Sequence, residues 1–333
     1  MMNRHRVQLS IALTRNDRTR ALLDGEVGAE GLDLVPSALA PGEMFWRQLK
    51  YGDFDVSEMS VSSLMIAASH GVRDWVALPV FTWREFFHTT IRVRADSAIR
   101  VPADLVGKRV GVKEYQQTAA LWTRGIMQHA FGVLPTDVEW FMERTASRSH
   151  GGSTDFRPPE GLRFSYIAPE ENLGAMLLGG QIDALYFYLP AKNVLDRSIV
   201  LEGNAAVRPL FPDPLAEGVR YYRETGIYPI NHCVVVRRSL MEKHPWIALN
   251  LYAAFTASKE LGRRRLADGI VPFLETGGVD ASAREALARD AMPYGVQSNL
   301  GVLSTIAAYQ VEQGLVSRAV ELDEIFWPST LTL

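Results

Sequence analysis

Polar side chains suited to binding an anion gather where an apolar strand gives way to a helix. The segment 107–127 reads GKRVGVKEYQQTAALWTRGIM, which predicts a strand over 108–112 and a helix that starts at Thr118. The first N–H groups of a helix have no partner within it and lie at the positive end of its dipole, so they attract carboxylates and phosphates. An aromatic residue at this turn could also stack on a ring. The candidate ligand-binding residues here are Lys113, Tyr115, Gln116, Gln117 and Thr118.

A second turn of the same design occurs earlier in the chain. Residues 55–59 predict a short strand, and 61–69 predict a helix of small residues that Ser60, Ser62 or Ser63 could cap. Two such helix starts that face each other would form a cleft for an anion.

Three arginines are candidates for holding a carboxylate, because a guanidinium pairs with one through two parallel hydrogen bonds. Arg15 and Arg18 follow directly after the first predicted strand, 7–13, where strand ends open onto the cleft of an α/β sheet. The alternative for both is a solvated surface turn. Arg84 either serves the same pocket or pairs with Glu85 at the surface.

Two histidines and one glutamate are the candidates for moving protons. His88 and His232 lie near the expected crossings between lobes, and histidine titrates near neutral pH. A hydrogen-bonded core histidine is the alternative for each. Glu58 ends a predicted buried strand, where a carboxylate needs a partner or a raised pKa. Together the three could also hold a divalent metal, although no ligand spacing supports that set.

Composition narrows the class of protein. The chain has 333 residues, of which 47% are hydrophobic, and this predicts a soluble protein of two domains. The net charge of −3 argues against nucleic acid as a partner, and we expect no membrane partner either. The single cysteine, Cys233, excludes an internal disulfide and any multi-cysteine metal site. The apolar residues near the N-terminus are too few and too interrupted for a signal peptide. We therefore expect a cytoplasmic protein.

Strands and helices alternate along the first two thirds of the chain, which is typical of α/β sheets with crossover helices. We expect one lobe from 1–94 and 229–333, with a helical C-terminal return, and a second lobe from 95–228. Crossings near Val93 and Tyr228 would join them side by side. The turn-rich stretch 145–159 predicts a lid or a disordered surface loop. Two α/β lobes around a cleft describe the type II periplasmic-binding-protein architecture.

Four segments carry a more specific likeness. FFHTTIRV from Phe86, GKRVGVKEYQQTAALWTRGI from Gly107, GIYPINHCVVVRRSL from Gly226 and KHPW from Lys243 resemble the bacterial 4,5-dihydroxyphthalate decarboxylases. The resemblance implies cytoplasmic enzymes on that scaffold, which remove CO₂ from a hydroxylated aromatic acid to give a catechol-type product such as protocatechuate.

The chemistry of this reaction defines what the site must supply. A proton delivered to the carbon that bears the carboxylate makes the ring an electron sink, and a deprotonated hydroxyl para to it supplies electrons. No organic cofactor is required in principle, and a divalent metal is left open. We expect Arg15 and Arg18 to hold the remaining carboxylate, His232 or His88 to move protons, and Trp46, Trp83 or Trp122 to contribute one or two walls.

Two other functions remain open on sequence alone. One is a cytoplasmic protein that binds a small carboxylate without changing it. The other is a biosynthetic enzyme on the same scaffold, such as one of thiamine-precursor or menaquinone-precursor synthesis. In each case the partner is a small molecule, and the sequence leaves room for a homo-oligomer.

Overall fold

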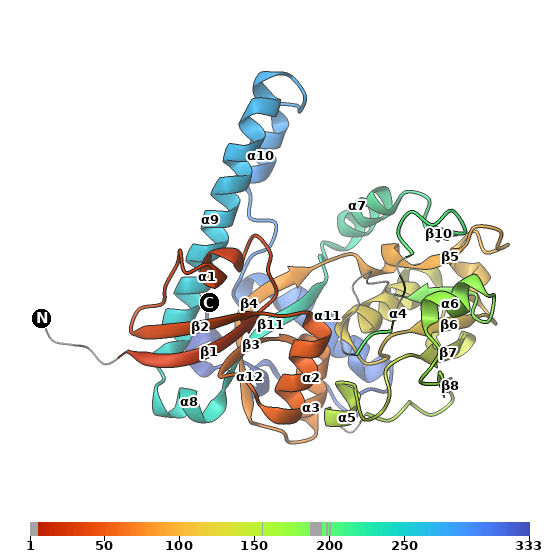
Figure 1. The fold of residues 1–333 in the computed structure, drawn as a ribbon, viewed down its shortest axis with the longest axis horizontal. Coiled ribbons are helices and arrows are strands. Elements are labelled where there is room, and N and C mark those ends of the chain that lie inside the picture. Colours follow the sequence, from red (N-terminus) through yellow and green to blue (C-terminus); the bar gives the residue numbers. More distant parts are fainter. Residues whose placement is uncertain (1–5, 155, 187–194, 198, 200) are drawn as a thin grey trace, which may run out of the picture.

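The chain folds into two α/β lobes (Figure 1) in a computed structural model that describes residues 6–154, 156–186, 195–197, 199 and 201–333. Lobe 1 is built on a sheet with strand order β2-β1-β3-β11-β4. β1 runs parallel to β2 and β3, and β11 runs antiparallel to both of its neighbours. The strands are β1 (Val7–Leu13), β2 (Leu32–Ala38), β3 (Val56–Ser60), β4 (Trp75–Arg84) and β11 (Ile230–Arg237). The helices are α1 (Arg20–Leu23), α2 (Pro41–Tyr51), α3 (Val61–Ser69) and α8 (Arg238–Lys243).

Lobe 2 is built on a second sheet with strand order β10-β5-β9-β6-β7-β8. Its strands are β5 (Arg92–Arg94), β6 (Arg109–Val112), β7 (Glu139–Met142), β8 (Arg163–Tyr166), β9 (Ala184–Tyr186) and β10 (Val207–Pro209). Its helices are α4 (Thr118–Phe131), α5 (Gly151–Thr154), α6 (Leu173–Leu178) and α7 (Pro214–Thr225). The short 3-10 helix η1 (Phe87–Thr90) precedes β5.

The C-terminal third is helical, with α9 (Ile247–Glu275), α10 (Ser282–Ala288), α11 (Leu300–Glu312) and α12 (Leu322–Ile325). α9 begins against α1 and β4 of lobe 1, and then continues with α10 as a hairpin that projects beyond the body of the molecule (Figure 1). α11 packs on both α3 and α4. The helical return therefore contacts both lobes, whereas the sequence suggested the first lobe alone.

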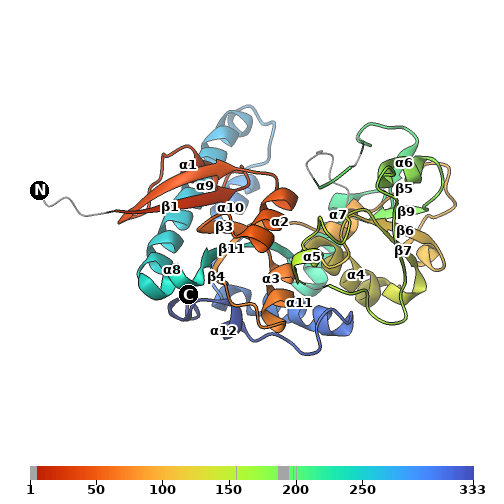
Figure 2. The same ribbon diagram turned by 60° about the horizontal axis from the view of Figure 1, so that its bottom comes forward.

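Two chain segments join the lobes side by side. The Glu85 N–H donates to the Pro229 carbonyl at 3.2 Å, and the rings of Phe86 and Tyr228 stack with centroids 4.8 Å apart. Such a paired connection lets two lobes move relative to each other about a narrow hinge. From the side that Figure 2 presents, the two lobes meet around the helices α2, α3, α4, α5 and α11.

Local sequence explains where the two cleft helices begin. Ser60 has extended backbone angles and accepts a hydrogen bond from the Ser63 N–H at 3.4 Å, so it caps α3. α4 starts at Thr118 after the extended Gln117 and ends at Phe131, and the following Gly132 has a φ of 69°, which suits glycine. Both helix starts agree with the sequence prediction, and the α/β architecture is confirmed.

Two predicted elements differ in the structure. The sequence also predicts a strand over 89–93 within the first lobe, but in the structure β5 belongs to the second sheet, because Arg92 and Val93 pair with Leu185 and Ala184. The stretch 145–159 contains α5 and packs on α2 and α3, so its described part is an ordered cover rather than a loose loop. The predicted strand 183–188 extends past Tyr186 into residues outside the described part.

No helix in the described part of the chain is long and apolar enough to cross a membrane.

Candidate functional site

A narrow cavity lies between the lobes, at the carboxyl end of β3 and the start of α4. Lobe 1 provides side chains from β3, β4, β11 and α2, and lobe 2 provides the α4 start and the stretch after β7. The lining residues are Pro41, Gly42, Phe45, Ser60, Trp83, Gln117, Thr118, Ala119, Arg144, His150, Asn231 and His232.

A histidine and a carboxylate form a buried pair on the lobe 1 side of this cavity. His232 Nδ1 lies 2.9 Å from Glu58 Oε2, and the other Glu58 oxygen accepts from the Thr14 N–H at 2.7 Å. The two residues sit on the neighbouring strands β11 and β3, where His232 faces Ser60 and Glu58 faces Val234. A carboxylate that accepts from Nδ1–H leaves Nε2 as the proton acceptor, and Asn231 Nδ2 donates to it at 3.0 Å. The arrangement presents a basic nitrogen to the cavity.

The start of α4 forms the opposite wall. Thr118 Oγ1 lies 2.8 Å from Ser60 Oγ and accepts from the Ser62 N–H at 3.0 Å, which links the two lobes across the cleft. Gln117 is buried, and its Nε2 has no hydrogen-bond partner within the described residues. An unsatisfied amide donor beside the free N–H groups of a helix start is suited to an anionic oxygen.

A buried charge cluster stands behind this wall. The Arg144 guanidinium donates to Glu114 Oε2 at 2.6 Å and to both oxygens of Asp196, at 2.8 and 3.2 Å. Burial alone would lower the pKa of Arg144, but the two carboxylates outweigh it and raise that pKa, so the guanidinium stays charged. Lys113 Nζ lies 3.8 Å from Asp196, and burial lowers the pKa of this ammonium. The cluster holds a cation at the cavity.

His150 is a second histidine at the cavity, on the side opposite His232. Its Nε2 lies 3.3 Å from Arg144 Nη1, and its Nδ1 lies 3.3 Å from Ser63 Oγ. Burial lowers the pKa of His150 to about 4, so this imidazole is neutral at pH 7. The ring of Phe45 contacts both histidines, and its centroid lies 5.4 Å from that of His150 and 4.7 Å from that of His232. Together with Trp83, it gives the cavity aromatic walls.

Of the predicted site residues, the structure brings four to this site: Glu58, Gln117, Thr118 and His232. The three predicted arginines lie elsewhere. Arg15 is exposed and pairs with Asp24 at 2.8 Å, and Arg18 donates from Nε to the Thr82 carbonyl at the base of α9. Arg84 is buried against Tyr228, Pro293 and Asn299, and burial lowers its pKa to about 10.

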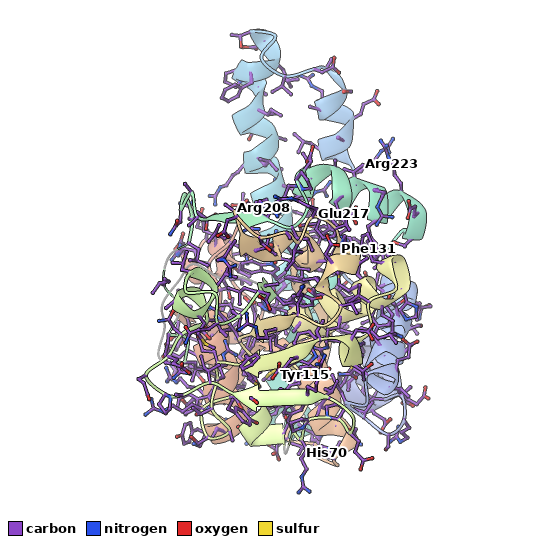
Figure 3. The ribbon with its side chains drawn as sticks, turned by 90° about the vertical axis from the view of Figure 1, so that its right-hand side faces the viewer. His70, Tyr115, Phe131, Arg208, Glu217 and Arg223 are labelled. Atoms are coloured by element: carbon purple, nitrogen blue, oxygen red, sulfur yellow. The ribbon has the colours of Figure 1, made fainter. Side chains whose placement is uncertain are left out.

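His88 lies beneath the hinge rather than at the cavity. Its Nε2 is 3.0 Å from Glu217 Oε1 on α7, and aromatic rings surround it. Burial opposes ionisation of Glu217, but hydrogen bonds from Arg220 and His88 outweigh it and lower the Glu217 pKa to about 2. Figure 3 shows Glu217 on α7, well away from Tyr115. His88 therefore has a structural partner of its own.

The remaining predicted residues of the turn before α4 support the site from behind. Tyr115 is buried, with the Arg124 guanidinium 3.6 Å from its ring centroid, so it does not face the cavity. Gln116 donates to Glu114 at 3.0 Å. Trp122 donates to the Ile230 carbonyl and does not line the cavity. Of the three candidate tryptophans Trp46, Trp83 and Trp122, Trp83 lines it.

No group of three or more histidine, cysteine, aspartate or glutamate side chains in the described part of the chain is arranged to hold a metal ion. In particular, His88 is separated from the Glu58–His232 pair, so the three do not form a ligand set.

Sequence reasoning missed Arg144, His150, Phe45 and Asn231. Asn231 precedes His232 directly, and Arg144 follows β7 at a strand end, so both positions carried a signal that topology could have used. His150 carried none, because it lies in a turn-rich stretch without periodicity. Phe45 reads as an ordinary apolar position on the amphipathic helix α2.

Comparison with known proteins places the fold among periplasmic binding proteins. The alkanesulfonate-binding protein SsuA of Xanthomonas axonopodis pv. citri, bound to MOPS, superposes with a TM-score of 0.57 at 18% identity, over 96% of this chain and 98% of that one. The aliphatic sulphonate binding protein SsuA of Escherichia coli gives 0.55 at 18% identity, over 96% and 92%. The desulfurization enzyme DszB gives 0.53 at 17% identity, over 98% of both chains. The scaffold therefore occurs in both binding proteins and an enzyme.

Sequence comparison is more specific. No family model matches the chain. A 4,5-dihydroxyphthalate decarboxylase of Comamonas testosteroni is 34% identical over 331 residues, which is 98% of each chain. One of Pseudomonas putida is 32% identical over 219 residues, which is 66% of this chain and 83% of the relative. Near-complete coverage at this identity shows that the chain belongs to the 4,5-dihydroxyphthalate decarboxylase family.

Proposed function

We propose that this protein converts 4,5-dihydroxyphthalate into protocatechuate and CO₂. The observation that carries the proposal is the Glu58–His232 pair, which faces the start of α4 and Arg144 across one cavity. This arrangement offers a base for a phenol at one end of an aromatic ring and seats for carboxylates at the other. The membership of the chain in a decarboxylase family supports the same reaction.

The hydroxyl end of the substrate meets lobe 1. The Asn231 amide releases Nε2 of His232 as the substrate enters, and Nε2 then takes the proton from the hydroxyl para to the departing carboxylate. Glu58 holds the opposite nitrogen and stabilises the imidazolium that forms. The phenoxide electrons move into the ring toward the carbon that bears the carboxylate. Trp83 and Phe45 confine the ring plane between them.

The carboxylate end meets lobe 2. The N–H groups at the start of α4 and the unpartnered Nε2 of Gln117 bind the carboxylate that remains, with Arg144 as the nearby cation. Burial of these groups strengthens their electrostatic contacts with the substrate.

The ring carbon needs a proton before the C–C bond breaks, and His150 is the group we assign to this step. A bound dicarboxylate beside the imidazole favours its charged form, so His150 takes up a proton as the substrate enters. Arg144 must then turn from Nε2 toward the substrate. Protonation of the ring carbon is followed by C–C cleavage: CO₂ leaves, the bonding electrons restore the ring, and the proton on His232 returns to the phenoxide.

The test is an assay of the purified protein with 4,5-dihydroxyphthalate, with and without chelator, which follows CO₂ and the absorbance of the product. We expect turnover with this substrate and none with phthalate, which lacks the hydroxyls that feed the ring. Tight binding of 4,5-dihydroxyphthalate without any CO₂ would contradict the proposal and favour a binding protein. Calorimetric titration in buffers of different ionisation enthalpy measures the proton uptake expected at His150.

The predicted cytoplasmic location belongs to the same proposal. The cysteine is a buried free thiol, which is compatible with a reducing compartment. Fractionation of cells that express the protein, followed by immunodetection, tests the location directly.

A further inference from the structure

The hairpin formed by the outer half of α9 and by α10 has no core of its own. We call residues 262–292 the arm; it projects from lobe 1 (Figures 1 and 3). No side chain from Arg263 to Met292 is buried, although the arm carries many apolar residues. Leu266 is 54% exposed and Phe273 is 57% exposed. Helices in proteins owe most of their stability to the packing of an apolar face, so a two-helix arm in open solvent lacks its main source of stability.

Charge is distributed unevenly along the arm. Its base carries Arg263, Arg264, Arg265 and Arg289, together with one carboxylate, Asp290, which pairs with Lys259 at 2.6 Å. Farther out it carries four carboxylates and a single arginine: Asp268, Glu275, Asp280, Glu285 and Arg284. Within the described residues, Arg264 and Arg289 make no ion pair, so two positive charges at the base are not neutralised by a carboxylate of the same chain. The outer part of a second arm, laid antiparallel, would bring carboxylates to these arginines.

A groove at the base is shaped for such a neighbour. Leu266, Leu287 and Met292 line it together with Arg18, Arg263 and Arg289, and Asp17, Lys259 and Asp290 also border it. The stretch of α9 from Gly262 to Glu275 is about 20 Å long at 1.5 Å per residue, so two overlapping arms bring the Phe273 turn of each to the groove of the other.

Gly269, near the middle of this stretch, also lacks an explanation within the chain. A helical glycine costs about 1 kcal/mol relative to alanine, yet a Cβ at this position would meet no atom within 4 Å. Close approach of another helix at the midpoint of the arm would account for it.

We propose that the arm pairs antiparallel with the arm of a second copy of this chain about a two-fold axis, forming a four-helix bundle. In such a dimer the same patch serves both copies, so the contact between a base and the outer part of the partner arm forms twice, once on each side of the axis. The pairing buries the apolar face that each arm exposes alone, and it leaves both clefts open.

Charge reversal tests this pairing in sedimentation velocity at micromolar protein. The base-reversed variant R264E/R289E and the tip-reversed variant E275K/D280K should each sediment as monomers, whereas the parent sediments as a dimer. An equal mixture of the two variants should restore dimers. In the mixed dimer, the acidic base of one variant faces the basic outer part of the other. The second contact of the same dimer pairs an unchanged acidic outer part with an unchanged basic base. The matched control E160K/E170K changes two exposed carboxylates of lobe 2 and should remain dimeric.

Circular dichroism confirms that each variant is folded before it is compared. A monomeric parent, a dimer that survives both reversals, or monomeric variants that fail to recombine would each overturn the proposal. None of these outcomes depends on whether the cleft is a decarboxylase site.

Discussion

At the residue scale, the central feature is a histidine whose role is set by its partner. Glu58 fixes Nδ1 of His232 and also accepts from the Thr14 N–H, so the imidazole cannot rotate without breaking a buried hydrogen bond. This gives Nε2 one direction and one tautomer. Because Glu58 acts through His232 and does not itself line the cavity, its charge can be removed by mutation without changing the side chains that line the cavity.

We expect Glu58→Gln to lower turnover by about a hundredfold or more, because the neutral amide no longer stabilises the imidazolium. The amide oxygen can still accept from Thr14, so KM and the fold should change little. Steady-state kinetics of protocatechuate formation measure both parameters. Glu26→Gln, which removes an exposed carboxylate paired with Arg265, is the matched control. Parent-like turnover in Glu58→Gln would exclude the assigned role.

The buried His150 predicts a dependence of stability on pH. Its pKa is about 4 in the folded protein, against 6.5 for the free side chain, so the unfolded state binds a proton first as pH falls. The free energy of unfolding should therefore decrease between pH 6.5 and pH 4 by about 3 kcal/mol from this group. Urea unfolding of the parent and of His150→Asn at pH 7 and pH 4 measures the difference. Val219→Ala, an exposed change that removes no titrating group, should keep the parent slope.

At the element scale, the helix starts around Ser60 and Thr118 were predictable because a cap and a strand-to-helix turn are local patterns in sequence. The positions of Arg15 and Arg18 were not. Both follow β1 at the cleft edge of the sheet as expected, but the direction of each side chain depends on tertiary partners, Asp24 and the Thr82 carbonyl. Arg144 and His150 meet only because the stretch after β7 folds back over α2 and α3.

The start of α4 provides the prediction at this scale. Thr118→Val removes the hydroxyl that bonds Ser60 and accepts from Ser62, so closure around a ligand weakens. We expect about a tenfold loss of substrate affinity, the size of one buried hydrogen bond. Isothermal titration of Thr118→Val, Ser60→Ala and the double variant should show effects that do not add, since one bond is shared. Thr123→Val, on the same helix, is the control; additive losses would place the link elsewhere.

At the scale of the whole molecule, the structure is a closed form. Ser60 and Thr118 touch across the cleft, and the stretch around α5 covers the cavity. The cavity that this form leaves is narrower than a planar dicarboxylate, so we expect the substrate to enter as the lobes separate about the paired segments at Glu85 and Pro229. The general shape followed from the alternation of strands and helices, whereas the projecting arm did not, because nothing local distinguishes a solvent-exposed hairpin from helices packed on a lobe.

If lobe motion limits turnover, kcat should fall as solvent viscosity rises. Product release then requires the same opening as substrate entry, because protocatechuate keeps a carboxylate and both hydroxyls. We expect kcat in sucrose to vary inversely with relative viscosity, and X-ray scattering to show a smaller radius of gyration with product bound. Ficoll, which raises bulk viscosity but hinders local motion little, is the control. A kcat that does not change with sucrose concentration would show that a chemical step, rather than lobe motion, limits turnover.

The separation of Glu58 and His232 on lobe 1 from Gln117 and Arg144 on lobe 2 also bears on how such an enzyme could change its substrate. The base on lobe 1 and the carboxylate seats on lobe 2, where His150 also lies, meet only on closure, so the groups of lobe 2 that recognise the substrate are separate from the Glu58–His232 pair. Directed evolution confined to the α4 start and its neighbours could therefore retarget the scaffold to other hydroxylated aromatic acids. The same architecture gives a reason for binding proteins to yield enzymes: capture of a ligand between two lobes is inherited, and proton-transfer groups are added at the cleft.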